Sequence, residues 1–478
     1  MKKRIVKWFL LALLFVTCYM AGGALFPFVR TKQVSEDFKN QFTVEEFYGS
    51  GSPDRAAVVE TSQDALDVRL RMLDGAKERI VLSTFDIRPG QSCDDVFAVI
   101  LAAADRGVDV KILVDGLYGW VHMWSEPMFY GLGSQPNIEF KFYNMPRPYK
   151  PWTINGRMHD KYVLADSRLA LLGGRNTFDY FLGEYNMKDL SYDRDVLIYN
   201  TEFETPQNTD SSVFQVDAYF QRMWELPECE TVFEEMKGGK EQKAQEELAR
   251  LRSHYEQMKE SRPEVFAPDW DYEAATVAVD KVTLIANPTH IYGKEPWVWY
   301  QLQELMRSAD DRVYIHTPYA VFSGDMYEGM TQICREVEDV SMLVNSVAVG
   351  DNIMASSDYV WNRKNILKTG VDLFEFQGDH SSHGKSLMID DDISVIGSFN
   401  LDMRSAYVDT ETMLVIQGEA FQDQLEACLL DMQAQSLRVQ EDETYAASDT
   451  VEPVELPLGR KVLFRITSIV FQLFRYLI

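Results

Sequence analysis

The pattern of apolar and polar residues separates a charge-free N-terminal run from a long region of alternating strands and helices. Residues 8–29 carry no charged side chain, and about 20 apolar residues are enough for a helix to span a bilayer. Downstream, residues 79–87 have the composition of a buried strand, residues 94–105 the periodicity of a helix, and residues 108–114 the composition of another strand. This order predicts parallel strands joined by right-handed crossovers.

The same order of elements recurs in the second half of the chain. Residues 312–320 and 340–344 are predicted strands, and residues 325–338 between them are a predicted helix. The fold class is therefore α/β, with two similar units that span residues 55–235 and 275–440.

Two segments lie outside the repeated units. Residues 236–274 include a charged stretch that is predicted to form a helical connector. Residues 441–478 begin as an acidic linker and end with apolar residues at helical spacing, interspersed with cations. We expect this end to be an amphipathic helix at a membrane interface; the alternative is a helix packed on the protein's own surface.

The first segment, residues 1–32, is predicted to be a retained transmembrane anchor. Its charge-free run is longer than the about 7–15 apolar residues of a cleaved signal peptide, which is the alternative interpretation. The run is preceded by the cations Lys2, Lys3, Arg4 and Lys7. By the positive-inside rule, we expect a single-pass protein of the cell membrane whose remaining chain, including any catalytic part, is extracytoplasmic.

Composition restricts the classes of partner. The chain has 47 Lys and Arg against 74 Asp and Glu, a formal net charge of −27. Nucleic-acid binders need basic surface for phosphate contacts, so we expect no nucleic-acid partner. The five cysteines are dispersed, and no carboxylate cluster resembles a metal site. We therefore expect no metal and no cofactor.

Two short motifs carry the candidate chemistry. They are HDKYVLAD, which begins at His159, and HGKSLMID, which begins at His383. Each enters a predicted β-hairpin, and side chains two apart on a strand share a face. Lys161 is therefore expected beside His159, and Lys385 beside His383. One such motif is weak evidence, but two at equivalent places in an internal repeat indicate one shared site.

The residues that follow each histidine complete the motifs. The closing aspartates, Asp166 and Asp390, are grouped with the catalytic residues, although their place at the hairpin turns predicts a structural role. The turns GGRN and GSFN then supply Asn176, Asn400 and Ser398 as candidate substrate-binding residues. A neutral imidazole is a nucleophile or base near neutral pH. With lysine cations and amide donors, it suits a phosphoryl group that gains negative charge during reaction.

The paired motifs resemble the HKD motifs of the phospholipase D superfamily. The second continues as GSFNLDMRSAYVDTE, similar to the N-x-D-x-R-S extension of bacterial cardiolipin synthases, although Asp409 stands where those enzymes commonly have asparagine. The aromatic residues after GGRN, Phe178, Tyr180 and Phe181, look like those of the third type of bacterial cardiolipin synthase. The resemblance covers roughly residues 60–440.

The resemblance implies a pseudo-dimer of two phospholipase D-like α/β units whose motifs meet in one pocket. It also implies that His159 attacks phosphorus to form a phosphatidyl-histidine, while His383 protonates the leaving alcohol and then deprotonates the incoming one. The lysines and asparagines of the motifs would hold the phosphate. Asp195 and Glu411, which each precede a predicted strand, are the candidates to accept a histidine ring N–H and fix its tautomer.

The implied activity is that of a phosphatidyl transferase of the cardiolipin synthase type, acting at a membrane on phosphatidylglycerol and a second phospholipid. One alternative is a hydrolase that releases phosphatidate with the same residues. A nuclease is disfavoured by the charge and the anchor, and an inactive scaffold by the completeness of both motifs. The sequence indicates no particular protein partner.

Residues 145–157, an insertion of the first unit with Arg147, Lys150 and Trp152, are predicted to dock on anionic lipid, or else to form a solvated surface loop.

Overall fold

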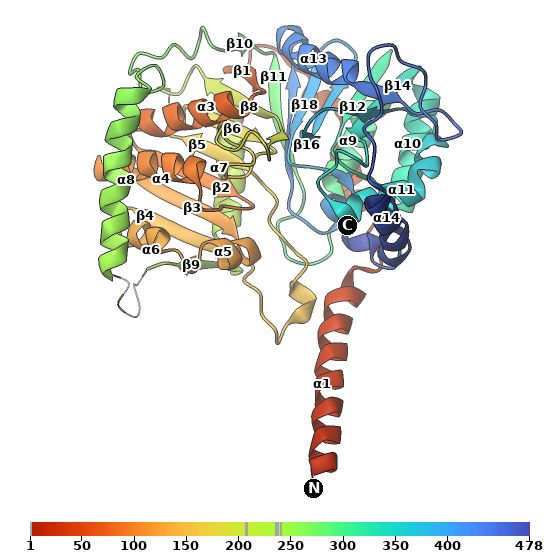
Figure 1. Cartoon of the computed structure of the whole chain (residues 1–478). Helices are drawn as coiled ribbons and strands as arrows, with labels where there is room; N and C mark the ends of the chain where they lie inside the picture. Colours follow the sequence, from red (N-terminus) through yellow and green to blue (C-terminus); the bar gives the residue numbers. More distant parts are fainter. Residues whose placement is uncertain (1, 206–208, 235–238, 240) are drawn as a thin grey trace.

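The computed structural model describes residues 2–205, 209–234, 239 and 241–478. Two large mixed sheets stand side by side, and helices cover their outer faces (Figure 1). One sheet has nine strands in the order β10-β1-β8-β6-β5-β2-β3-β4-β9, and the other has eight in the order β11-β20-β18-β17-β12-β14-β15-β21. The predicted fold class of two similar α/β units is confirmed.

The first unit is built from β1 (Asp54–Val59), α3 (Ser62–Gly75), β2 (Arg79–Thr84), α4 (Gln91–Asp105), β3 (Asp109–Asp115), α5 (Gly116–His122), α6 (Pro127–Gly133), β4 (Ile138–Tyr143), β5 (Tyr162–Ala165), β6 (Leu169–Gly173), β7 (Ser191–Tyr192), β8 (Asp195–Asn200), α7 (Ser212–Trp224) and β9 (Cys229–Val232). The strands β2, β3 and β4 pair in parallel, as the strand–helix–strand pattern predicts. The neighbouring strands β5, β6, β8 and β1 are antiparallel, and a short turn connects β5 to β6 as a hairpin.

The second unit is built from β11 (Lys281–Ala286), α9 (Trp297–Arg307), β12 (Arg312–His316), β13 (Ala320–Val321), α10 (Gly324–Glu336), β14 (Asp339–Asn345), α11 (Ile353–Leu367), β15 (Asp372–Phe376), β16 (Ser381–Ser382), β17 (Ser386–Ile389), β18 (Ile393–Gly397), β19 (Leu401–Asp402), α12 (Met403–Tyr407), β20 (Thr412–Gln417), α13 (Glu419–Ala434) and β21 (Ser436–Arg438). Before it, β10 (Val277–Ala278) still pairs with β1, so the first sheet reaches slightly past the predicted boundary at residue 275.

One hydrophobic core joins the two units. It contains Leu172 and Ile198 from the first sheet together with Ile396 and Leu414 from the second, all of them buried. Side chains alternate between the faces of a strand, so each sheet presents one apolar face to the shared core, where helices α7 and α13 also pack. The shared core fixes the two histidine motifs relative to one another.

The predicted connector is a helix, but it packs on the first unit. Helix α8 (Glu241–Ser261) buries Leu248 and Leu251 against the core of that unit. Arg250 forms an ion pair of 2.6 Å with Asp94 of α4. This helix therefore extends the outer layer of the first unit.

The N-terminal segment is long and apolar enough to cross a membrane. The helical run Lys2–Phe28 comprises α1 (Lys2–Leu25) and a short 3-10 turn (Phe26–Phe28), and it is the one such run among the residues described. No residue of α1 is buried, in contrast to a core helix, and the helix projects away from both sheets (Figure 1).

The insertion at residues 145–157 contacts the end of α1. The hydroxyl of Tyr19 donates a hydrogen bond of 2.8 Å to the carbonyl of Tyr149, and the side-chain amide of Asn155 donates one of 2.7 Å to the carbonyl of Ala24. The insertion therefore lies where α1 meets the folded part of the chain.

The C-terminal segment packs one face on the second unit and leaves the other face exposed. Helix α14 (Leu458–Phe471) lies on α11 and buries Phe464 and Ser468, and Arg475 beyond it forms an ion pair of 3.0 Å with the buried Asp358. The outer face of α14 and the turn after it nevertheless leave large apolar side chains exposed: Leu458, Val462, Ile466, Ile469 and Leu473. The helix thus meets the prediction of an amphipathic segment, and its position at a membrane stays a prediction.

Candidate active site

The two histidine motifs lie at the entrance of equivalent hairpins. His159 and Lys161 precede β5, and His383 and Lys385 precede β17, so these residues occupy extended segments just before the strands rather than the strands themselves. The hairpins β5–β6 and β17–β18 are confirmed as antiparallel pairs. In each motif the lysine ammonium group turns back and donates a hydrogen bond to the carbonyl of its own histidine, as the 2.6 Å bond of Lys161 shows.

The aspartates that close the motifs are not at the site, which corrects their grouping with the catalytic residues. Asp166 adopts a positive φ of 56° and Asp390 one of 48° at the hairpin turns. The Asp166 carboxylate accepts hydrogen bonds from the backbone N–H groups of residues 77–79, and the Asp390 carboxylate accepts them from residues 310–312. Aspartate tolerates this backbone conformation and caps such turns. Both residues therefore hold the start of a neighbouring strand.

His159 is held by the second unit. Its backbone N–H donates to the carbonyl of Thr410 at 3.2 Å, and its Nδ1 lies 2.9 Å from the Glu411 carboxylate. Glu411 is fully buried. A carboxylate accepts only, so Nδ1 carries the proton and Nε2 is left with a free lone pair. The predicted contact of Glu411 with a catalytic histidine is present.

His383 is held by the first unit in the same manner. Its backbone N–H donates to the carbonyl of Tyr192 at 2.6 Å, and its Nδ1 lies 2.7 Å from the Asp193 carboxylate. The Lys385 ammonium group is also 2.7 Å from this ring nitrogen. Each histidine is therefore oriented by an acid from the opposite half of the chain, and neither half alone holds a complete set.

The predicted partner Asp195 is wrong, and the strand register explains why. Gly173 pairs with Asp195 in the first sheet, whereas Gly397 pairs with Met413 in the second. The residue equivalent to Glu411 therefore lies two positions before Asp195, at Asp193. Asp195 instead forms ion pairs with the buried Arg69 and Arg175 at 3.0 and 3.2 Å.

A pair of substitutions separates the two aspartates. Asp193→Asn should lower turnover about 10- to 100-fold, the usual effect of removing the group that orients a catalytic side chain. Asp195→Asn, two residues away, should leave turnover close to wild type and lower the melting temperature, because it weakens the ion pairs that Arg69 and Arg175, both buried, form with Asp195. Initial rates on a phospholipid substrate and thermal melts of both variants check this. Equal loss of turnover in the two variants would contradict the assignment.

The side chains after the hairpins divide into two roles. Asn176 and Asn400 are buried, and the side-chain oxygen Oδ1 of each has no hydrogen-bond partner among the described residues. A buried amide with an unpartnered polar atom is expected to bond a ligand. Ser398 does not share this role: its hydroxyl donates to the Glu411 carboxylate, so its assignment to substrate binding is corrected to support of Glu411.

Burial and neighbouring charges set the protonation of the site. Burial lowers the pKa of Lys161 to about 7 and that of Lys385 to about 8, and mutual repulsion of the two ammonium groups adds to the fall for Lys161. Burial and the charges of Lys161 and Lys385 hold the pKa of His159 well below its ordinary value. Lys385 and His383 therefore lie close enough to His159 to influence its pKa.

The two acids that contact the histidines, Glu411 and Asp193, differ in the direction of their pKa shifts. Burial raises the pKa of Glu411 well above its ordinary value, and the cation of Lys161 only partly offsets this. For Asp193, burial acts in the same direction, but the positive charges of Lys385 and His383 outweigh it and lower the pKa. Asp193 is therefore the firmly ionised acid of the pair, and the histidine beside it is the one better able to hold a second proton.

Aromatic rings line the histidines. The ring of Phe85 lies edge-on to His159 with centroids 5.0 Å apart, and the ring of Phe181 is 5.1 Å from that of His383. Tyr180 and Tyr319 donate hydrogen bonds of 3.2 and 2.7 Å to Asp351. Apolar walls of this kind exclude water from the reacting groups. In the described part of the chain, no group of three or more histidine, cysteine or acidic residues is arranged to hold a metal ion.

Sequence reasoning missed Asp193 and Asp351. Asp193 is placed by the pairing of β6 with β8, which no local pattern in the sequence reveals, and it packs so close to Gly174 that a side chain there would collide with its carboxylate. Asp351 follows β14 outside any motif, and no sequence signal marks it.

Comparison with known proteins shows which families share these features. A family model described as "Cardiolipin synthase, PLD-like domain" matches residues 70–224 and 302–432. Cardiolipin synthase C of Escherichia coli is 26% identical over 398 residues, which cover 76% of this chain and 81% of that protein. An uncharacterized protein of Helicobacter pylori is 24% identical over 420 residues, which cover 80% of each chain.

A solved structure shares the fold. The crystal structure of phosphatidylserine synthase from Haemophilus influenzae superimposes with a TM-score of 0.63 at 15% sequence identity. The match covers 90% of this chain and 97% of that one, so it includes both units.

Proposed function

The chain belongs to the family of cardiolipin synthase PLD-like domains and is a phospholipid transferase of the phospholipase D superfamily, so we propose that it transfers the phosphatidyl group of phosphatidylglycerol to a second phospholipid. The resemblance drawn from the motifs is confirmed by this membership. The matched regions include both histidine motifs, and the relatives named cardiolipin synthase support the choice of donor and product.

In the first step, Nε2 of His159 attacks phosphorus and the bond from phosphorus to the glycerol oxygen breaks. His383, protonated, donates the Nε2 proton to the leaving glycerol. The products of this step are free glycerol and a phosphatidyl group bound to His159. Lys161, Lys385 and the free amides of the two asparagines stabilise the charge on the phosphoryl oxygens.

In the second step, neutral His383 removes the proton from a hydroxyl of the incoming phospholipid. That oxygen attacks phosphorus, the nitrogen–phosphorus bond to His159 breaks, and His383 regains its proton. Water in place of the lipid hydroxyl would give phosphatidate, the hydrolytic alternative.

The difference between the two acids supports this division of roles. His159 is kept neutral by burial and by two cations, as a nucleophile requires. His383 faces the ionised Asp193, which stabilises an imidazolium and so favours the role of acid and base. The observation that carries the proposal is this pair of histidine–acid contacts, each made across the two units.

The proposal is tested by the products formed from labelled phosphatidylglycerol. Membranes that contain the full chain should release glycerol and form a lipid with two phosphatidyl groups from phosphatidylglycerol alone. A second run with added phosphatidylethanolamine, whose headgroup has no hydroxyl to accept the group, shows by release of ethanolamine whether that lipid also serves as a phosphatidyl donor. Release of phosphatidate as the main lipid product in both runs would replace the transferase with a hydrolase.

The lysines predict an alkaline limit to activity. Lysine is charged below its pKa, so kcat/KM should fall as the pH rises through about 7 and 8, the values for Lys161 and Lys385. Burial and the charge of Lys385 also lower the pKa of His383, so loss of its acid form adds to this fall. The limit should move to higher pH in Lys161→Arg, because a guanidinium group stays charged. On the acid side, activity should persist below pH 6.5, since the pKa of His159 is lowered well below that value. A flat profile from about pH 7 to 10 would contradict the role of the lysines.

We also propose that the anchored enzyme places its catalytic part outside the cytoplasm. The cations before the apolar run support this orientation, and the insertion at residues 145–157, which contacts α1, would then lie at the outer leaflet. Protease added to intact spheroplasts should digest the folded part of the chain, whereas full protection would place that part in the cytoplasm.

A further inference from the structure

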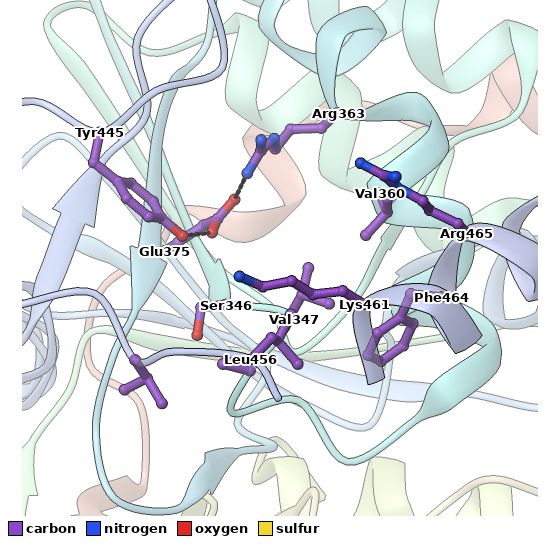
Figure 2. Close-up of a pocket in the computed structure, with 12 residues that line it drawn as sticks. Ser346, Val347, Val360, Arg363, Glu375, Tyr445, Leu456, Lys461, Phe464 and Arg465 are labelled. Atoms are coloured by element: carbon purple, nitrogen blue, oxygen red, sulfur yellow. Dashed lines mark hydrogen bonds and ion pairs between the residues drawn. The ribbon is translucent and has the colours of Figure 1, made fainter. Parts of the chain in front are cut away.

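A second pocket lies in the second unit, outside the catalytic site. It has a volume of about 260 Å³ and is enclosed by α11, by α14 and by the chain that leads to α14 (Figure 2). Its polar lining includes Ser346, Arg363, Lys461 and Arg465. None of these residues belongs to the histidine motifs, and the proposed reaction uses none of them.

The pocket has an excess of positive charge. Lys461 and Arg465 are four residues apart on α14, on the same side of the helix. Across the described residues, no acidic side chain lies within ion-pair distance of either one. Lys461 reaches across the pocket, and Arg465 extends beside Val360 (Figure 2).

The acid in the pocket does not neutralise these cations. Glu375 is fully buried and accepts hydrogen bonds from Tyr359 at 2.6 Å, from Arg363 at 3.0 Å and from Tyr445. Its charge is therefore matched by Arg363 and by two hydroxyl groups. The charges of Lys461 and Arg465 remain for a ligand.

Buried polar atoms in the pocket also lack partners. The hydroxyl of Ser346 has no hydrogen-bond partner in the described chain, although the residue is only 2% exposed. The Nε of Arg363 is buried without a hydrogen bond, but it lies 3.6 Å from the Glu443 carboxylate, so it is not free for a ligand. The buried hydroxyl of Ser346 and the two cations without acidic partners form a set of donors that suits the oxygens of a phosphate group.

The surroundings of the pocket are those of a lipid-facing surface. Leu456 and Phe464 line the pocket itself, and the outer face of α14 continues with Ile466 and Ile469, which are 58% and 62% exposed. Phe28, at the end of the apolar N-terminal run, belongs to the same hydrophobic core as the C-terminal segment. Figure 1 shows α14 beside the end of α1 that meets the folded part.

We propose that this pocket binds the phosphate group of an anionic phospholipid, whose acyl chains lie along the exposed face of α14. The site is separate from the catalytic histidines and goes beyond the proposed function, because it requires no turnover. The loop after β14 connects this pocket to the catalytic site. Ser346 in this loop lines the pocket. The side chain of Asn345, just before it, donates a hydrogen bond to the carbonyl of Ser382, and Asp351, beyond it, accepts one from the hydroxyl of Tyr319.

The test counts lipids bound to the full chain in detergent by native mass spectrometry, with dihexanoyl-phosphatidylglycerol as the probe. All proteins carry His159→Ala, so that the lipid is not consumed and the result does not depend on the proposed reaction. The variant Lys461→Gln/Arg465→Gln is compared with Arg460→Gln, which removes a neighbouring cation of α14 outside the pocket. Thermal melts without lipid confirm that each variant folds.

The affinity of the double variant for one phosphatidylglycerol should fall about tenfold or more, because each cation near an anionic lipid contributes about 1 kcal/mol. In the spectra, the double variant should therefore carry one phosphatidylglycerol fewer than the parent. Arg460→Gln should bind as the parent does. Dihexanoyl-phosphatidylcholine should not occupy the lost site, and equimolar inorganic phosphate should not displace the lipid. Equal lipid counts in all variants would overturn the site, and displacement by inorganic phosphate would overturn its assignment to a lipid.

Discussion

The variant His159→Ala is expected to lose at least about four orders of magnitude of turnover and all covalent labelling by the lipid. The reason is chemical: without the imidazole, no nucleophile remains in contact with phosphorus, and loss of a nucleophile in comparable enzymes has an effect of this size. The loss should be the same on phosphatidylglycerol and on a phosphatidyl ester of p-nitrophenol, because attack on phosphorus is required for both.

A control variant tests whether loss of any histidine would have the same effect. His254→Ala removes a partly exposed histidine of α8 that lies 2.6 Å from the buried Asp95 of α4 and belongs to neither motif. It should retain turnover. If His159→Ala kept more than about a hundredth of wild-type turnover with an unchanged fold, the nucleophile would have to be another group.

The variant His383→Ala should lose turnover on phosphatidylglycerol to a similar extent, but for a different reason. Glycerol is a poor leaving group without a proton donor, so its release should be slow. p-Nitrophenol leaves without protonation, so the first burst of p-nitrophenol should survive in this variant while later turnovers stop.

The leaving-group comparison separates the two histidines. His380→Ala, three residues before His383, removes a histidine that is 3.7 Å from Asp379 and serves as the control with normal turnover. Absence of the burst in His383→Ala, combined with a burst in His159→Ala, would reverse the two roles. Normal turnover of phosphatidylglycerol in His383→Ala would exclude His383 as the acid and base.

The parts of the fold and site that the sequence predicts are those set by local pattern. Strands β2 and β3 and helix α4 follow from apolar runs and helical periodicity, and the two hairpins follow from turn residues. The motif histidines and lysines could be found because their spacing repeats. The location of Asp166 and Asp390 at turns also follows from local chemistry, and the structure shows their side chains bonding backbone there.

The parts that could not be predicted depend on contacts across the chain. Asp193 and Asp195 are both acids near the start of the same strand, and only the pairing of β6 with β8 decides which of them reaches His383. Ser398 shares a turn with Asn400, but its contact with Glu411 depends on the pairing of β18 with β20. The second pocket requires the end of β14 and helix α14 to meet, more than a hundred residues apart in the sequence.

The central claim is that the phosphatidyl group passes through His159, and peptide mass mapping tests it most directly. His383→Ala is mixed with phosphatidyl-p-nitrophenol, denatured at alkaline pH to preserve the nitrogen–phosphorus bond, and digested. We expect one phosphatidyl adduct, on the peptide that contains His159, with a yield that matches the burst of p-nitrophenol. An adduct on any other residue, or a full burst without an adduct, would contradict it.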